Sequence, residues 1–140
     1  KTQRYCSNEI VNAVLFDKTS VAKEESIKII DDIILDNNTG IADFDICRVF
    51  INLLDNSINA LKNYTGDDKL LYLSCKQDND HIFIKCENKF SETIRKPEKK
   101  PELHGYGMKI VKDITEKYNG ELITQIQDTT FSTLAILKTE

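Results

Sequence analysis

The segment from residue 44 to residue 64 most constrains the fold, because it carries two opposed stripes of side chains at helical spacing. Asparagine is a mediocre helix former, so a helix that repeats it on one face gives up stability there. The polar face is therefore either a solvated surface of an asparagine-rich chain or a site that holds a polar ligand against a core. The apolar stripe is formed by Cys47, Phe50, Ile51, Leu54, Ile58 and Leu61, and the polar stripe by Asn52, Asn56, Asn59 and Asn63.

Two more segments repeat apolar residues near the period of a helix, and local signals mark where the helices begin and end. Ser7 is a candidate cap of the first helix, and Asp43 or Asp45 of the second. Asn119-Gly120 is expected to end the third helix in a left-handed conformation. The predicted helices cover residues 8–25, 44–64 and 107–118.

Strand patterns fill most of the remaining chain. Tight turns at Asn79-Asp80 and Asp128-Thr129 predict two hairpins. Residues 89–104 contain both prolines, Pro97 and Pro101, and show almost no periodicity, which predicts a long functional loop. The predicted strands cover residues 26–35, 69–78, 81–88, 121–127 and 130–137.

The order of these elements predicts an α+β fold, a mostly antiparallel five-stranded sheet with three helices on one face. A length of 140 residues fits one domain, residues 1–140. No apolar run is long enough to span a membrane, and a net charge of -4 argues against a general nucleic-acid binder. The chain opens with Lys1-Thr2-Gln3-Arg4 and no methionine or signal peptide, so we expect a fragment of a larger protein.

The cysteines and histidines do not form a recognisable metal motif. None of the four cysteines belongs to a Cys-x-x-Cys pair, which favours buried free thiols in a reducing compartment. His81 and His104 are too few and too far apart for a zinc site. The cysteines are Cys6, Cys47, Cys75 and Cys86.

A second motif lies where the third helix begins. His104-Gly105-Tyr106-Gly107-Met108 places two glycines at the start of that helix. Glycine lets a backbone approach a ligand closely, and a helix N-terminus offers free N–H groups and a positive dipole. The motif is either a phosphate site or a hinge for the preceding loop.

The loop and the strand before it add two weaker signals. Cations in or beside the loop could neutralise a polyphosphate, although a solvated charge run explains them equally well. Asn88 lies where the apolar alternation of the strand ends, and a polar side chain there can contact the edge of a base. The cations are Lys89, Arg95, Lys96, Lys99 and Lys100.

These motifs, in this order, resemble the GHKL superfamily, which includes gyrase-type ATPases, MutL proteins, heat-shock-90-type chaperones and histidine kinases. The segment Asn52–Ala60 resembles its N-box, and His104–Ile110 resembles its second glycine box. The amino-acid sequences of both segments are similar to those in Agr-type and VirS-like peptide quorum-sensor histidine kinases. The resemblance covers essentially the whole chain and implies a two-layer Bergerat-type sandwich with a mixed sheet and a long ATP lid.

By position, the resemblance implies a role for each polar residue. Asn56 matches the residue that ligates Mg²⁺ on the ATP phosphates. Asn52 occupies the place where hydrolysing members carry a glutamate that activates water, and an amide cannot act as that base. Asn59 stands where many histidine kinases carry a lysine or arginine. Asn88 replaces the aspartate that contacts the adenine amino group, and the glycines that follow that aspartate are absent here.

The second glycine box is expected to bind the nucleotide phosphates. By resemblance this role falls on His104, Gly105, Tyr106, Gly107 and Met108, with Leu103 in place of the leading glycine. Weak nucleotide affinity is expected from the incomplete first glycine box.

The implied protein is the catalytic and ATP-binding domain of a two-component sensor histidine kinase. It would use ATP and Mg²⁺ and act on a histidine of a separate dimerisation domain, so it would be inactive toward that acceptor alone. A response regulator would be an indirect partner; nucleic acid would not be one. The domain would lie in the cytoplasm, without membrane contact of its own, as part of a membrane receptor.

Two other functions stay open at this point. One is a nucleotide-binding regulatory module, such as an anti-sigma-type serine kinase, although those kinases resemble the hydrolases in carrying glutamate where Asn52 stands. The other is a structural interaction domain, which the incomplete first glycine box would permit.

Overall fold

The computed structural model describes residues 5–91 and 106–139. Every predicted helix and strand is present in these residues, with bounds that differ by at most two residues from the predicted ones. The helices are α1 (Glu9–Glu24), α2 (Asp43–Lys62) and α3 (Tyr106–Lys117). The strands are β1 (Lys28–Ile33), β2 (Leu70–Gln77), β3 (His81–Lys89), β4 (Glu121–Gln127) and β5 (Thr130–Lys138).

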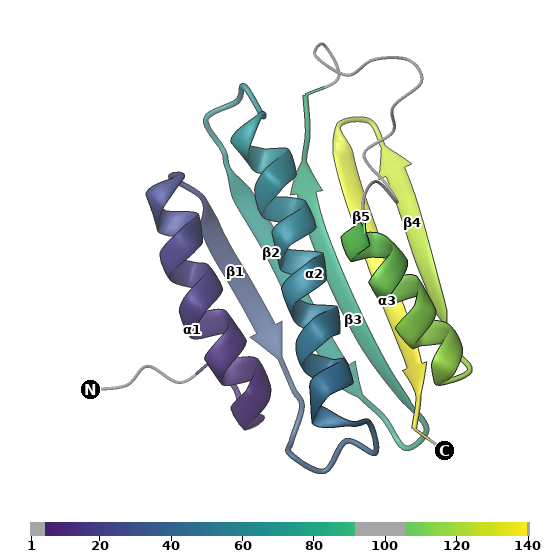
Figure 1. Ribbon diagram of the computed structural model, residues 1–140. Coiled ribbons are helices and arrows are strands. Elements are labelled where there is room, and N and C mark those ends of the chain that lie inside the picture. The colour runs from purple at the N-terminus through teal and green to yellow at the C-terminus, as the bar shows by residue number, and fades with distance from the viewer. Residues whose placement is uncertain (1–4, 92–105, 140) are drawn as a thin grey trace.

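The five strands form one mixed sheet in the order β1-β2-β3-β5-β4. Strands β1 and β2 are parallel, and the other neighbouring pairs are antiparallel. All three helices lie on one face of the sheet, with α2 between α1 and α3 (Figure 1). The predicted α+β class is therefore confirmed, as a two-layer sandwich with a five-stranded sheet.

Side chains along the strands alternate between the helix layer and the open face of the sheet. In β3 the inward positions are apolar up to Cys86, and the next inward residue, Asn88, is 2% exposed. Its neighbour Lys89 is exposed on the other face. This alternation places a polar side chain at the end of β3, under the helices. The other buried core residues of the central strands are Leu71, Leu73, Cys75, Ile82, Ile84, Phe131, Ala135 and Leu137.

The central position of α2 widens its buried face beyond the predicted stripe. The helix packs against α1, α3 and the sheet together, so residues on several sides of it lose contact with water. Cys47 and Ile51, two members of the predicted stripe, are only half-buried. The apolar stripe in the sequence predicted too narrow a buried face, because one stripe corresponds to packing against one partner. The additional buried residues are Asp45, Ile46, Val49, Leu53 and Ser57.

Two of the predicted helix caps are wrong. Asn8, not Ser7, caps α1, because its side chain accepts a hydrogen bond from the Val11 N–H at 3.0 Å. The N-cap of α2 is Ala42, which has no side chain able to cap. Neither Asp43 nor Asp45 therefore serves as that cap, although both lie in the first turn, where the helix dipole favours a negative charge.

Three other predictions lie partly or wholly within the described residues. Asn119 has a φ of 58° and ends α3 in the left-handed conformation that was expected. Cys6, Cys47, Cys75 and Cys86 are free thiols, three of them buried and Cys47 half-buried. Most of the predicted lid, from residue 92 to residue 104, lies outside the described residues.

No helix in the described part of the chain combines the length and the apolar character that a membrane span requires.

Candidate functional site

The asparagine stripe of α2 is graded in burial along the helix. Asn52 and Asn56 are half-buried, whereas Asn59 and Asn63 are exposed. The two half-buried residues lie one turn apart in the middle of the helix, beside core residues such as Leu53 and Leu54. Packing of α2 between α1 and α3 therefore separates two asparagines held near the core from two that face water.

Asn52 lies where α2, which carries the N-box, contacts the start of α3. Its side-chain nitrogen donates a hydrogen bond to the Arg48 carbonyl oxygen at 2.7 Å, which leaves Oδ1 turned away from its own helix. A Cβ atom added to Gly107 would lie 3.0 Å from that Oδ1. Glycine at position 107 thus allows the first turn of α3 to lie directly against Asn52, and two motifs 55 residues apart meet here.

Asn56 has a half-buried carboxamide with unused hydrogen-bonding capacity. Among residues 5–91 and 106–139 its side chain has no hydrogen-bond partner, whereas Asn52 is anchored to Arg48. A half-buried amide oxygen is a ligand that hard cations such as Mg²⁺ accept. The structure therefore leaves Asn56 available for the metal position that the resemblance gave it.

The first turn of α3 supplies backbone donors beside Asn52. Residues Tyr106, Gly107 and Met108 open this helix, so their N–H groups have no partner within it. The first turn contains no acidic residue, so nothing on it opposes the positive end of the helix dipole. Met108 is 1% exposed, which leaves only its backbone N–H for a ligand. His104 and Gly105 lie outside the described residues.

Asn88 takes part in a buried polar chain beneath α2. Ser57 Oγ donates to Asn88 Oδ1 at 2.8 Å, and Asn88 Nδ2 donates to the Lys89 carbonyl oxygen at 3.0 Å. Cys86 Sγ lies 3.3 Å from Ser57 Oγ. Burial raises the pKa of the Cys86 thiol to about 12, so the thiol remains protonated and can donate a hydrogen bond.

Ser57 is the functional candidate that sequence reasoning missed. It is 2% exposed and lies on the core side of α2, between Leu53 and Leu61 at a spacing of four. The signal was present, because a hydroxyl on a core stripe requires a partner. The sequence could not identify Asn88 as that partner across 31 positions.

Lys89, one of the cations predicted in or beside the loop, forms an ion pair with Asp68. Its Nζ lies 2.9 Å from Asp68 Oδ2, and Tyr64 donates to Asp68 Oδ1 at 2.7 Å. These two hydrogen bonds, Tyr64 first, lower the pKa of Asp68 to about 2. The remaining cations of the predicted set lie outside the described residues.

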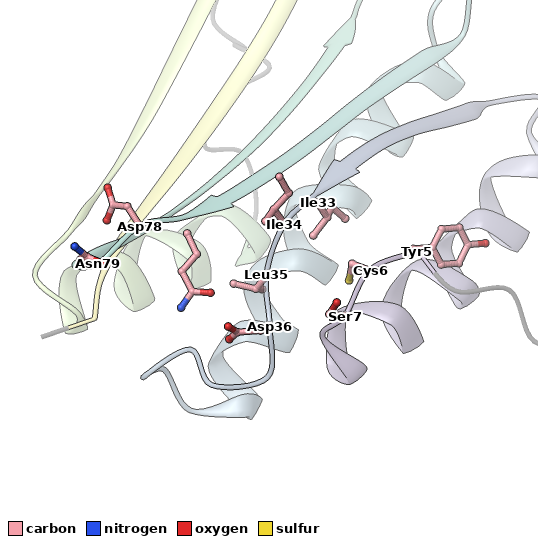
Figure 2. A pocket seen from close by; sticks show the side chains of 10 residues that line it. Tyr5, Cys6, Ser7, Ile33, Ile34, Leu35, Asp36, Asp78 and Asn79 are labelled. Atoms are coloured by element: carbon pink, nitrogen blue, oxygen red, sulfur yellow. The ribbon is translucent and has the colours of Figure 1, made fainter.

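Among the described residues, cavities lie at both ends of the sheet. A cavity of ≈ 750 Å³ lies between the segment Tyr5–Ser7, the end of β1 and the β2–β3 turn (Figure 2). The far end of β3 carries Asn88, which lines a smaller cavity of ≈ 260 Å³ together with Asp68, Leu70, Tyr72, Glu87, Lys89 and Thr130. The larger cavity contains none of the predicted site residues, so we assign the site from the asparagines and the start of α3.

The oxygen and N–H groups of the site suit a magnesium ion that is coordinated mainly by substrate phosphates and water, with few protein ligands. Within the described residues no three His, Cys, Asp or Glu side chains gather where they could hold a metal. Mg²⁺ commonly takes one or two protein oxygens together with substrate phosphates and water. The half-buried Asn56 amide and the N–H groups in the first turn of α3 match that division between metal and phosphate.

Comparisons with known proteins identify the family of the chain and relatives with the same fold. A sequence model of the GHKL domain matches residues 41–137. No curated protein sequence matches the chain. The structure is similar to the nucleotide-free catalytic domain of the histidine kinase ThkA, with a TM-score of 0.71 at 16% identity over 94% of this chain and 90% of that one.

Two further histidine kinases share the fold. AdeS of Acinetobacter baumannii gives a TM-score of 0.61 at 15% identity, covering 93% of this chain and 65% of that one. A histidine kinase of Burkholderia phymatum STM815 gives 0.71 at 6% identity, covering 96% and 69%. The matched family segment, residues 41–137, is well over half of the 140-residue chain, and the chain therefore belongs to the GHKL domain family.

Proposed function

We propose that this chain binds Mg-ATP and passes the γ-phosphoryl group to a histidine on a separate dimerisation domain, as the catalytic domain of a two-component sensor histidine kinase. The observation that carries the proposal is the meeting of the N-box with the start of α3. Asn52 Oδ1 faces Gly107 closely enough that a Cβ there would lie at 3.0 Å. This contact supports the proposal because Asn56 lies one helical turn from Asn52 on α2.

Each site residue has a distinct role in the proposal. Asn56 would ligate Mg²⁺, and the N–H groups of Tyr106, Gly107 and Met108 would hold phosphate oxygens. Asn88 would contact the base. The bound metal ion would neutralise charge on the phosphates, which leaves positioning as the main task of the protein.

His104, Gly105 and Asn59 complete the proposed binding set. The first two precede α3 directly in the sequence, and the exposed Asn59 lies three positions after Asn56 on α2. Asn59 would approach the phosphates from the outer side of the helix.

The residue at position 52 favours transfer over hydrolysis. An amide cannot accept a proton from water in the way that a carboxylate does. The Asn52 nitrogen is also held by the Arg48 carbonyl oxygen at 2.7 Å, so this side chain positions the start of α3. The absence of a base at this position supports an acceptor other than water.

The wider context follows from the resemblance to Agr-type and VirS-like kinases. The domain would lie in the cytoplasm as one part of a membrane-bound quorum-sensing receptor. Its partners would be the dimerisation domain of the same protein and, through that domain, a response regulator. Residues 1–140 would form the catalytic and ATP-binding domain of this larger protein.

Calorimetry with ATP tests the binding step. We expect Mg²⁺-dependent binding by the wild-type chain, and a loss of at least about tenfold in affinity for Asn56→Ala, because the variant removes the metal ligand. Asn63→Ala is the matched control, since Asn63 belongs to the same stripe but is exposed at the end of α2. No binding of ATP or ADP at millimolar concentration would contradict the proposal.

Phosphotransfer is tested by adding the dimerisation domain of the parent protein. The expected product is an acid-labile phosphohistidine on that domain, detected by its loss after acid treatment. Acid-stable phosphoserine on a partner would instead support the anti-sigma-type alternative. Nucleotide binding without transfer to any acceptor would support a regulatory module.

A further inference from the structure

The hydrogen bonds around Asn88 fix the direction of its carboxamide. The Lys89 carbonyl oxygen can only accept a hydrogen bond, so the group 3.0 Å from it must be the Asn88 NH₂. The oxygen of the amide then faces Ser57, and the Ser57 hydroxyl must donate its single proton across 2.8 Å. Turning the amide around would bring two acceptors together at Lys89, so the Lys89 carbonyl oxygen sets the direction and the hydrogen bond from Ser57 holds the amide in it.

The position of the Cys86 thiol is consistent with this direction. Since the Ser57 proton goes to Asn88, the thiol proton can be donated only to Ser57 Oγ at 3.3 Å or to the Leu53 carbonyl oxygen at 3.8 Å. The side chains of Cys86, Ser57 and Asn88 are at most 2% exposed, so the hydrogen bonds among them are shielded from solvent. Hydrogen-bond donation therefore runs in one direction along this chain, from Cys86 through Ser57 and Asn88 to the backbone.

The direction matters because asparagine, unlike aspartate, can match either of two purine edges. After its two protein contacts, Asn88 retains one acceptor site on Oδ1 and one N–H on Nδ2. That pair matches an adenine-type edge, an exocyclic amino group beside a ring nitrogen, as asparagine does on adenine in DNA. Turned around, the same amide would match a keto group beside a ring N–H.

We infer that Ser57 is a positioning residue that holds the Asn88 carboxamide in the orientation that selects an amino group over a keto group at position 6 of the purine. The inference rests on the proposed function, because it concerns the base of the nucleotide bound there. Ser57 does not contact the nucleotide. It acts through Asn88 and sets base preference, whereas Asn56 and the start of α3 set affinity for the polyphosphate.

The test compares ATP with inosine triphosphate, whose base carries a keto group at position 6. Dissociation constants for both are measured at one free Mg²⁺ concentration for the wild-type chain, Ser57→Ala and Ser57→Thr. Thr115→Val is the matched control, because Thr115 is also a buried hydroxyl on a helix but bonds to its own helix at Lys112. Circular dichroism establishes that each variant is folded.

The expected wild-type preference for ATP is about tenfold, the scale of one well-placed hydrogen bond. Ser57→Ala should reduce the preference below about threefold, because Asn88 loses one of its two anchors and its free acceptor and N–H are no longer held toward the base. Ser57→Thr keeps the hydroxyl and should retain the preference, and so should Thr115→Val. The ratio of two affinities is insensitive to a general loss of stability, which would weaken both nucleotides together.

The possible results separate this inference from the function beneath it. A wild-type chain that binds neither nucleotide would overturn both. A chain that binds ATP but shows no preference, or a Ser57→Ala variant that keeps the full preference, would overturn the role of Ser57 and leave the nucleotide site intact. A preference lost in Ser57→Ala and kept in both other variants would support it.

Discussion

Asp45 has a carboxylate that is 4% exposed and contacts the end of α3. Lys117 Nζ lies 2.8 Å and the Tyr118 hydroxyl 2.6 Å from Asp45 Oδ2, and Arg48 lies 3.6 Å from Oδ1. Burial raises the pKa of Asp45, but the hydrogen bonds from Lys117 and Tyr118 outweigh it and place the pKa below its ordinary value of 3.8. The ionised form is therefore bound more tightly in the folded state.

Asp45→Asn should lower the free energy of unfolding by about 1–3 kcal/mol at neutral pH, because charge-assisted bonds to both partners are weakened. A depressed pKa contributes stability above the unfolded value, near 3.8, which is lost as pH falls through the lower folded value. The variant should therefore also lose less stability than wild type as pH falls below about 4. Urea titrations at pH 7 and pH 3 measure both effects.

A suitable control for Asp45→Asn is Asp113→Asn on α3. Asp113 pairs with Lys109 at 3.1 Å, but both side chains are more than half exposed. Exposed pairs contribute little, so this variant should unfold at nearly the wild-type urea concentration. If both variants unfolded at the same urea concentration, the contacts of Asp45 with Lys117 and Tyr118 would not stabilise the domain.

Asp45 also shows where sequence reasoning stops at the level of single residues. Its position in the first turn of α2 suggested a cap, which is a local role. Its hydrogen-bond partners lie 72 and 73 residues away, and no pattern within α2 can indicate them. Ser57 and Asn88 are missed as a pair for the same reason, whereas Asn52 and Gly107 were identified singly because each has a strong local signal.

At the level of elements, local signals placed every helix and strand of the described chain. Alternation and turn residues are local properties, so both hairpins and the end of α3 follow from them. The breadth of the buried face of α2 does not, because it depends on α1 and α3 packing from both sides. Half-burial of Asn52 and Asn56 follows from this packing and could not be derived from the spacing alone.

The connection from α3 to β4 requires two residues of special geometry. Asn119 adopts a φ of 58°, and the Gly120 N–H donates to the Thr115 carbonyl oxygen at 2.8 Å. A Cβ atom on Gly120 would lie 1.8 Å from the Ile136 carbonyl oxygen in β5. Backbone, not a movable side chain, occupies that space, so α3 depends on glycine to stay in contact with the sheet.

Gly120→Ala should therefore destabilise the domain by more than about 2 kcal/mol, because α3 or β5 must move. Asn119→Gly should instead stabilise the domain by up to about 1 kcal/mol, since glycine adopts positive φ without strain. Thermal denaturation followed by circular dichroism measures both variants. A Gly120→Ala chain as stable as wild type would show that the close approach is not a constraint in solution.

On the scale of the whole molecule, the helix layer isolates the centre of the sheet from solvent on one side. Cys75 and Cys86 lie on the neighbouring strands β2 and β3, both facing the helices, and are 1% and 0% exposed. Burial raises the pKa of each of these two thiols to about 12. Cys47, on α2, is half-buried. These three cysteines therefore report on different depths of one structure.

Alkylation by excess iodoacetamide near pH 7.5 should modify Cys47 directly and leave Cys75 and Cys86 protected. A thiol must be exposed and ionised to react, so modification of these two requires the helices to separate from the sheet. Their rates should rise with urea in parallel with global unfolding, while the rate at Cys47 changes little. Mass spectrometry of the labelled peptides gives each rate separately. Modification of Cys75 or Cys86 at the Cys47 rate in native buffer would contradict this prediction, because it would mean that the two layers open without unfolding.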